Sequence, residues 1–302
     1  MLPFKLIYHP GYDLNLGSHV FPSQKFRLIR ERLLADGFAQ EDDFVEPDPA
    51  TDEDLKLAHT PDWVWRLGTG QLTPQEVMEL EIPFSRQMQE AFWLAAGGSI
   101  LAARLALRDR IAYNVGGGFH HAYPAHGEGF CAIHDVAVAI RRLQQDKLIE
   151  KAMVVDCDVH HGNGTAAIFG DDPSVFTLSI HQFNNYPRLK PPSDLDIHLL
   201  DGVGDDEYLE RLEDGFRPAI RSFRPDLLMY IAGADPYWDD QLGGLMLSME
   251  GLRKRDELVL RTAKEKGIPA AITLAGGYAR KLEDTITIQS NTAKVAAEVL
   301  AP

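Results

Sequence analysis

The sequence is poor in cysteine and in positive charge. Cys131 and Cys157 are its only cysteines, and neither stands in a Cys-x-x-Cys pair. A disulfide framework or a cysteine zinc site is therefore not expected. The chain has 30 lysines and arginines against 45 aspartates and glutamates, which gives a formal net charge of −15. This balance argues against direct binding to nucleic acid or to anionic membranes, and it mildly favours cationic ligands.

Long apolar segments and internal boundaries are also missing. The first residues carry only Lys5 as a positive charge and contain no apolar signal-peptide core. No uninterrupted apolar run approaches the length of a membrane span. The sequence shows no repeat, no low-complexity tract and no linker that could separate domains. We therefore expect one cytoplasmic domain over residues 1–302, large enough to bury roughly three quarters of its unfolded surface.

Short β-branched or apolar segments alternate with segments of helical periodicity. The expected strands are Lys5–Tyr8, Ile111–Val115, Ala152–Asp156, Val175–Ile180, Asp196–Leu200, Leu227–Ala232 and Ala270–Leu274. The expected helices lie near residues 23–36, 85–108, 134–146, 205–223, 248–266 and 284–299. The acidic stretch Glu41–Asp54 is expected to be a surface loop that leads into a helix. This alternation predicts an α/β fold with a mostly parallel sheet and helices on both faces.

Chemically active residues collect where the expected strands end, and open α/β sheets bind ligands at the carboxyl ends of their strands. His120 and His121 follow the strand Ile111–Val115 after three glycines. Glycines allow a tight loop beside a ligand, and two histidines there could exchange protons near neutral pH. On its own, however, such a pair is more often a solvated turn.

The segment DCDVHHGNG, residues 156–164, follows the strand that begins at Ala152. Alternate residues of an extended segment share a face, so Asp158 and His160 can converge on one cation, with Asp156 one step behind. A carboxylate and an imidazole suit zinc or another borderline divalent metal. A polar surface turn is the alternative, but aspartates that directly follow an apolar strand are costly to bury without an ion partner.

Two further strand ends supply one residue each. Asp235 follows the expected strand that begins at Leu227, and Tyr278 follows the last expected strand after two glycines. Each of them alone is more often structural. Together with Asp158 and His160, however, Asp235 would leave a fourth zinc position open for water, as catalytic zinc sites do. With histidines for proton transfer and a tyrosine donor, the set suffices for metal-assisted amide hydrolysis.

Four motifs, GGGFHHA, DCDVHHGNGT, GADPYWDDQLGG and LAGGY, occur in this order. With them the sequence resembles the histone deacetylase family over nearly its whole length. The form DCDVHHGNG and the segment DDQLGGL look most like the class IV branch and its bacterial relatives, the histone deacetylase-like amidohydrolases. The resemblance implies the arginase–deacetylase fold, a three-layer αβα domain. It also implies zinc-dependent hydrolysis of the amide bond of an acylated lysine side chain.

The resemblance implies two kinds of metal site. Asp158, His160 and Asp235 would hold one zinc ion per chain, although Fe²⁺ or Co²⁺ would also suit these ligands. A structural potassium ion would lie beside it. Its ligands would be the side chains of Asp156 and Ser179 and the carbonyls of Asp158, His160 and Ile180.

The resemblance also implies the catalytic roles. His121 would act as general base on the water and then as acid toward the leaving amine, and His120 would be its electrostatic companion, oriented by Asp156. Tyr278 would donate to the substrate carbonyl as it becomes tetrahedral. Two residues would line the narrow tunnel for the acyl-lysine chain: Gly129 and Phe130.

One position departs from the class I pattern. Asn163 stands where class I members have an aspartate behind the second histidine. A neutral amide stabilises an imidazolium less than a carboxylate does. We therefore expect His121 to be less basic than its class I counterparts, with a shift in the pH–rate profile of Asn163→Asp.

Several alternatives stay open at this stage. An arginase-like ureohydrolase with two manganese ions would share the fold, but it needs more bridging carboxylates than we find. A catalytically silent binding module would keep the fold alone, although every catalytic position holds a competent residue. The substrate could be an acylated lysine in a peptide or protein, with an acetyl or a longer acyl group. It could instead be an acetylated polyamine or another small acylamine.

Overall fold

The computed structural model describes residues 1–301, and within them eight strands form one sheet. The strand order is β2-β1-β3-β8-β7-β4-β5-β6, and each neighbouring pair is parallel. The strands are β1 (Leu6–Ile7), β2 (Phe44–Val45), β3 (Ile111–Asn114), β4 (Ala152–Asp156), β5 (Val175–Gln182), β6 (Leu195–Leu199), β7 (Leu227–Ile231) and β8 (Ala270–Thr273). The structure confirms the predicted α/β fold with its parallel sheet.

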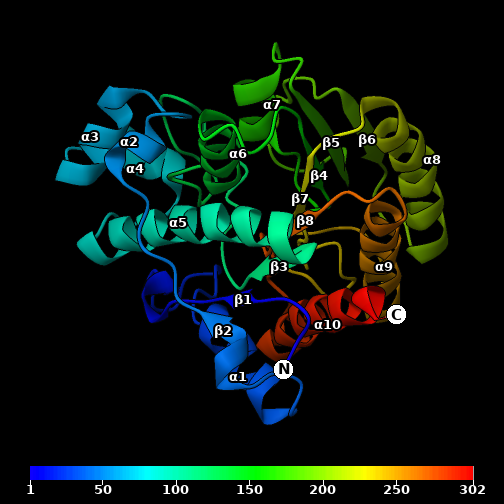
Figure 1. Ribbon diagram of the computed structural model, residues 1–302. Helices are drawn as coiled ribbons and strands as arrows, with labels where there is room; N and C mark the ends of the chain where they lie inside the picture. The colour runs from blue at the N-terminus through cyan, green and yellow to red at the C-terminus, as the bar shows by residue number, and fades with distance from the viewer. Residues whose placement is uncertain (302) are drawn as a thin grey trace.

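Helices cover both faces of this sheet (Figure 1). The α-helices are α1 (Lys25–Ala35), α2 (Asp52–Leu55), α3 (Pro61–Thr69), α4 (Pro74–Leu80), α5 (Arg86–Asp109), α6 (Asp135–Gln145), α7 (Asn163–Phe169), α8 (Asp205–Phe223), α9 (Met249–Glu265) and α10 (Leu282–Leu300). Two short 3₁₀ helices, η1 (Pro10–Tyr12) and η2 (Glu41–Asp43), complete the described chain.

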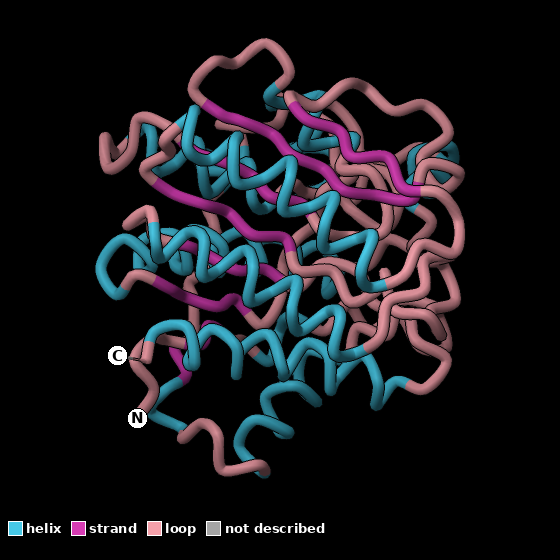
Figure 2. Tube along the Cα trace, turned by 90° about the vertical axis from the view of Figure 1, so that its right-hand side faces the viewer, coloured by secondary structure: helices cyan, strands magenta, loops and turns pink. Residues whose placement is uncertain are grey.

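The strand order assigns the helices to two layers. Right-handed crossovers place α5, α6 and α7 on one face, because each leads toward the β6 edge. Helices α1, α8 and α9 lead in the opposite direction and cover the other face. Helix α10 packs against α1 and α9 and joins that second layer. Figure 2 looks onto the second layer, whose helices lie along the strands, and Figure 1 shows that helices also cover the other face, so the arrangement is a three-layer αβα one.

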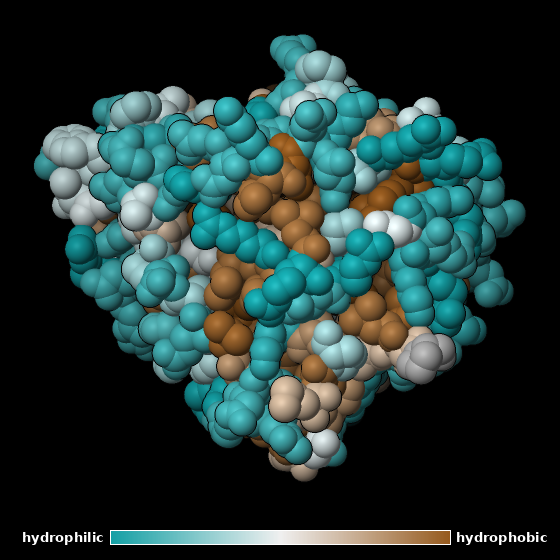
Figure 3. Space-filling model, in the orientation of Figure 1, coloured by the Kyte–Doolittle hydropathy of each residue, from teal (hydrophilic) through white to brown (hydrophobic). Residues whose placement is uncertain are grey.

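The central helix α5 has the length and apolar composition of a membrane span, but 67% of its apolar window is buried inside the protein. Ser85 caps its start by accepting a hydrogen bond from the Met88 amide at 3.0 Å. The helix packs on α6, β3 and β8. We therefore interpret α5 as a core helix. Polar side chains dominate the face in Figure 3, and the brown apolar patches are confined to its centre.

The N-terminal third departs from the sequence prediction. The acidic stretch Glu41–Asp54 is not only a loop, because it contains η2, the edge strand β2 and the start of α2. A two-residue strand that pairs only with β1 has too few residues to show periodicity. Helices α3 and α4 were not expected. Each begins with a threonine cap followed by proline, at Thr60 and Thr73, and this signal is visible in the sequence.

Candidate active site

The four strand ends singled out in the sequence belong to four neighbouring strands. The sheet places β3, β8, β7 and β4 side by side and parallel, so their carboxyl ends open at one edge. The segments that leave this edge are long, as in 115–134 and 232–248, whereas those at the opposite edge are short, as in 224–226. Loops accordingly gather at one end of the sheet in Figure 2. The topology therefore brings the candidate residues together.

Asp158, His160 and Asp235 converge at this edge. One ligand atom from each residue lies within 4.8 Å of the other two, and all three side chains are buried. His160 Nδ1 lies 3.0 Å from Asp158 Oδ1 and 3.4 Å from Asp235 Oδ2. The structure thus brings together the three residues that the sequence proposed as metal ligands.

Backbone groups fix both carboxylates of this cluster. Asp158 accepts hydrogen bonds from the amides of His160 and Gly276, at 2.9 and 2.8 Å, and Asp235 Oδ1 accepts from the Val159 amide at 2.9 Å. Asp235 Oδ2, however, is buried and makes no hydrogen bond among the described residues, and its ion-pair contact is His160 Nδ1 at 3.4 Å. An unpaired buried carboxylate oxygen is costly unless a cation faces it. The donor set therefore fits a divalent metal ion.

The charges of the cluster lead to the same conclusion. Burial and the neighbouring Asp158 carboxylate raise the pKa of Asp235 to about 7. Burial alone would lower the pKa of His160, but the hydrogen bond with Asp158 and the charges of Asp158 and Asp235 raise it to about 10. Two carboxylates in a dry site thus hold a proton strongly when no cation is bound. A divalent cation would take the place of that proton.

A buried arginine joins the two loops that carry Asp158 and Asp235. Arg255 of α9 is 0% exposed and donates from Nη1 to the carbonyl of Gly233 at 2.6 Å and to that of Cys157 at 3.3 Å. Its charge is balanced by Asp256, which lies 2.8 Å away. Gly233 is needed at this point because a Cβ there would lie 2.7 Å from the Asp158 Cα. The two loops are therefore joined through one side chain.

The paired histidines lie beside the cluster with different partners. His120 Nδ1 is 2.6 Å from Asp156 Oδ2, and His121 Nδ1 is 2.6 Å from Asn163 Oδ1. Burial would lower the pKa of His120, but Asp156 and Asp158 raise it to about 9. Burial and the charge of His120 place the pKa of His121 well below its usual range. His121 is therefore the neutral member of the pair, which suits a base.

A narrow cavity of about 160 Å³ opens onto these residues. Its lining residues are Glu81, His121, Gly129, Phe130, His160, Asn185, Tyr186, Leu242 and Tyr278. Gly129 and Phe130 both have positive φ, 53° and 67°, and this sharp turn presents them to the cavity. Burial raises the pKa of Tyr278 well above its usual value, so its hydroxyl stays a donor. The sequence missed Asn185 and Tyr186, which come from the loop between β5 and β6.

The predicted potassium ligands lie on neighbouring strands. Asp156 and Ser179 are register partners on β4 and β5, and both are buried. Ser179 Oγ lies 3.0 Å from His181 Nδ1. The potassium site itself stays a prediction.

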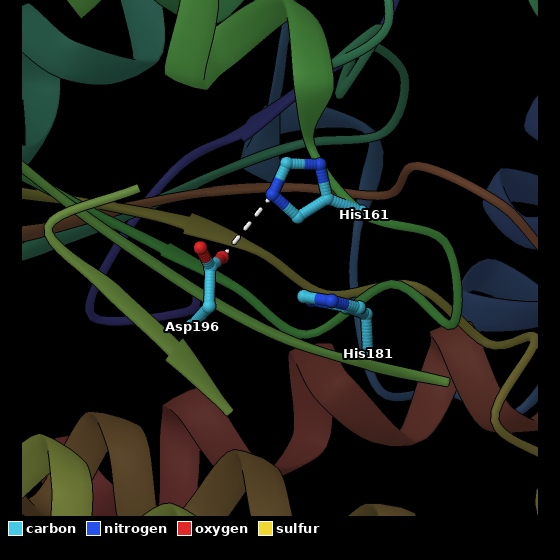
Figure 4. Close-up of side chains that lie close together, drawn as sticks. All are labelled: His161, His181 and Asp196. Carbon is cyan, nitrogen blue, oxygen red and sulfur yellow. Dashed lines mark hydrogen bonds and ion pairs between the residues drawn. The ribbon is translucent and has the colours of Figure 1, made fainter. Parts of the chain in front are cut away.

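A second polar cluster lies under the same loop, formed by His161, His181 and Asp196 (Figure 4). His161 Nε2 lies 3.1 Å from Asp196 Oδ1. The two nitrogens of His181 lie near Ser179 Oγ, at 3.0 Å, and His198 Nδ1, at 2.9 Å. Hydrogen bonds thus account for His161 Nε2 and both nitrogens of His181, whereas His161 Nδ1 makes none among the described residues. We interpret the cluster as a brace for the loop that carries His160.

His59 holds the loop after β3 from the α2–α3 side. Its Nδ1 lies 3.0 Å from the Tyr123 carbonyl, and its Nε2 accepts from the His134 amide at 2.9 Å. The segment between these two contacts carries Gly129 and Phe130 into the cavity wall. Burial lowers the pKa of His59 to about 4.

This depressed pKa predicts a loss of stability in acid. Above pH 6.5 His59 is neutral in both the folded and the unfolded protein. Between pH 6.5 and 4 only the unfolded protein binds a proton at His59, so the free energy of unfolding decreases as the pH is lowered. By pH 4.5 the loss from this residue should be about 2–3 kcal/mol. Urea unfolding at pH 7 and pH 4.5 measures it, with His59→Gln as the comparison. An equal pH dependence in both proteins would contradict the assignment.

Comparison with known proteins relates this site to a family. The histone deacetylase domain model matches residues 19–293. The chain is 40% identical to an uncharacterised protein of Picosynechococcus sp., over 98% of this chain and 99% of that protein. It is 34% identical to histone deacetylase 2 of Arabidopsis thaliana, over 93% and 77% of the two chains. The acetoin utilization protein AcuC of Bacillus subtilis is 31% identical, over 78% and 67%.

A solved structure agrees with the fold. The HDA15 HD domain superposes with a TM-score of 0.84 at 24% identity, over 100% of this chain and 91% of that chain.

Proposed function

Because the chain belongs to the histone deacetylase family and is a deacetylase-type amidohydrolase, we propose that it hydrolyses the amide of an acylated lysine side chain with zinc as cofactor. One observation carries this proposal above the others. Asp158, His160 and Asp235 form a buried cluster in which Asp235 Oδ2 makes no hydrogen bond, and His160 of this cluster lines a cavity together with His121 and Tyr278. The candidate metal cluster thus meets the two candidate proton-transfer groups, His121 and Tyr278, at one small cavity.

When bound there, a divalent cation supplies Lewis acidity, which polarises an amide carbonyl and acidifies a water molecule. The ring of His121 is oriented by Asn163 through Nδ1, so its Nε2 is the atom left to accept the proton of the attacking water. The same atom then delivers that proton to the amine as the carbon–nitrogen bond breaks. The Tyr278 hydroxyl donates a hydrogen bond to the carbonyl oxygen while negative charge develops there. His120 remains paired with Asp156.

The cavity limits the shape of the substrate. Phe130 and Tyr186 give it aromatic walls, and its volume of about 160 Å³ suits a linear aliphatic chain better than a branched or cyclic one. Glu81 is exposed and lines the same cavity. A carboxylate at this position favours substrates with a second positive charge, so an acetylated polyamine is the second candidate.

The test uses purified protein loaded with zinc. We expect hydrolysis of a fluorogenic acetyl-lysine peptide, complete inhibition by a hydroxamate, and one metal ion per chain by elemental analysis. Parallel assays with longer acyl-lysines and with N-acetylated polyamines rank the substrates. No turnover of any of these acylamines would refute the proposal and favour a binding module, and two metal ions per chain would favour a ureohydrolase-like site.

A further inference from the structure

Behind the proposed base, a continuous hydrogen-bonded chain leads to a carboxylate outside the metal cluster. His121 Nδ1 lies 2.6 Å from Asn163 Oδ1, and Asn163 Nδ2 donates to Glu128 Oε1. Asn163 is 1% exposed, whereas the Glu128 side chain is 22% exposed. The amide therefore stands between a buried ring and a partly solvated acid.

Glu128 is held in its acceptor form. The Tyr186 hydroxyl donates to the same oxygen, Oε1, at 2.9 Å, and His126 Nε2 lies 3.3 Å from Oε2. Partial burial alone would raise the pKa of Glu128, but hydrogen bonds from His126, Tyr186 and Asn163 outweigh burial and lower it. The carboxylate is therefore ionised at neutral pH and can only accept hydrogen bonds.

Unlike an aspartate, an asparagine that contacts a histidine ring does not by itself determine which ring nitrogen carries the hydrogen. Its side chain can present either the carbonyl or the amino group to the ring, and rotation exchanges the two. With the carbonyl facing His121, Nδ1 must carry the hydrogen, and Nε2 is free to accept a proton. With the amino group facing it, Nδ1 would accept and Nε2 would carry the hydrogen. A base in that second tautomer cannot take a proton from water.

We propose that Glu128 is a positioning residue that fixes the orientation of the Asn163 amide and thereby keeps His121 in the tautomer with Nε2 free. A carboxylate tolerates only the amino group of Asn163 opposite it, so the carbonyl must face His121. The pair of Asn163 and Glu128 does together what a single aspartate would do, with the negative charge placed one side chain farther from the ring. This role rests on the proposed hydrolase function of the site.

The same carboxylate also joins the base to the cavity wall. Tyr186 lines the cavity and stands edge-on to the His121 ring, with a centroid distance of 4.9 Å. Gly129, the residue after Glu128, is part of that wall as well. Glu128 therefore fixes the position of Asn163, which contacts His121, relative to Tyr186 in the cavity wall.

The decisive experiment exchanges the two side chains. Glu128→Gln removes the acceptor-only group, and we expect kcat to fall roughly 10- to 100-fold, the scale of a hydrogen bond to a charged group, with little change in KM. Asn163→Asp alone places two carboxylates in contact and should also be impaired. In the double variant E128Q/N163D the new amide donates to the new carboxylate, so kcat should recover to within a few-fold of wild type. Glu150→Gln, an exposed glutamate, is the matched control.

Nitrogen-15 NMR of the histidine rings in metal-free protein gives a readout that is independent of turnover. We expect His121, identified by the loss of its signals in His121→Phe, to carry hydrogen on Nδ1 in the wild type and in the double variant. In Glu128→Gln we expect a mixture of tautomers. A pure Nδ1–H tautomer in Glu128→Gln, or a double variant no better than the single variants, would overturn the role. An inactive wild type that shows these tautomer changes would refute the proposed function alone.

Discussion

Replacing His160 with alanine should abolish both metal binding and turnover. His160 supplies the only nitrogen of the three-residue cluster, and its ring stands within 3.4 Å of both carboxylates. Without it, Asp158 and Asp235 would face each other in a dry site with only two ligands for an ion. The loss should exceed the roughly 10- to 100-fold weakening that follows from removing a supporting hydrogen bond at a metal site.

Elemental analysis after dialysis against substoichiometric zinc measures the effect on binding, and hydrolysis of an acetyl-lysine peptide measures the effect on turnover. Glu150→Ala, a substitution of an exposed residue outside the cavity and outside both polar clusters, is the control and should retain both properties. Circular dichroism verifies that the His160 variant is folded. One zinc ion per chain in folded His160→Ala would show that the ligand assignment is wrong.

The change Tyr278→Phe should lower kcat by roughly 100-fold or more, the scale of one lost oxyanion donor. The Tyr278 ring lines the cavity, its backbone is fixed by a 2.6 Å hydrogen bond from its amide to Asp240, and its hydroxyl stays protonated. Phenylalanine keeps the ring and removes only the donor. Zinc content and thermal stability should therefore stay close to those of wild type, which separates this effect from that of His160→Ala.

Tyr237→Phe is a matched control, because its hydroxyl bonds to Asp284 at 3.3 Å, outside the cavity. It should retain wild-type kcat. Steady-state kinetics with one acetyl-lysine peptide compares the three proteins. Wild-type kcat in Tyr278→Phe would remove this residue from the mechanism.

The strand ends explain why the site could be predicted. Asp158, Asp235 and Tyr278 each follow a short apolar segment, and in a parallel sheet the carboxyl ends of strands share an edge. The sequence does not state the strand order, but β3, β8, β7 and β4 are adjacent, so residues from distant parts of the chain meet. The strand β4 has the predicted limits because its first four residues are apolar and all five, up to and including Asp156, are buried.

Other parts of the site depend on how loops pack, and a pattern along the chain does not contain that information. Glu128 lies 35 residues before Asn163 and showed no motif of its own. Tyr186 reaches the cavity from a loop between β5 and β6 that has no periodicity. In the sequence, Asn163 stands where class I members have an aspartate, and this neutral amide predicts that His121 is a weaker base. The structure adds the carboxylate behind it, and that changes the expected behaviour of Asn163→Asp.

Arg255 joins the two loops that carry Asp158 and Asp235 without lining the cavity, so the support of these loops is separate from the cavity lining. Arg255 extends from α9, and none of its hydrogen bonds among the described residues goes to a residue that lines the cavity. The distance between the loops that carry Asp158 and Asp235 is thus set from the α9 side. If these loops bind an ion as proposed, a substitution of the buried Arg255 is expected to weaken ion binding while the residues that line the cavity stay the same.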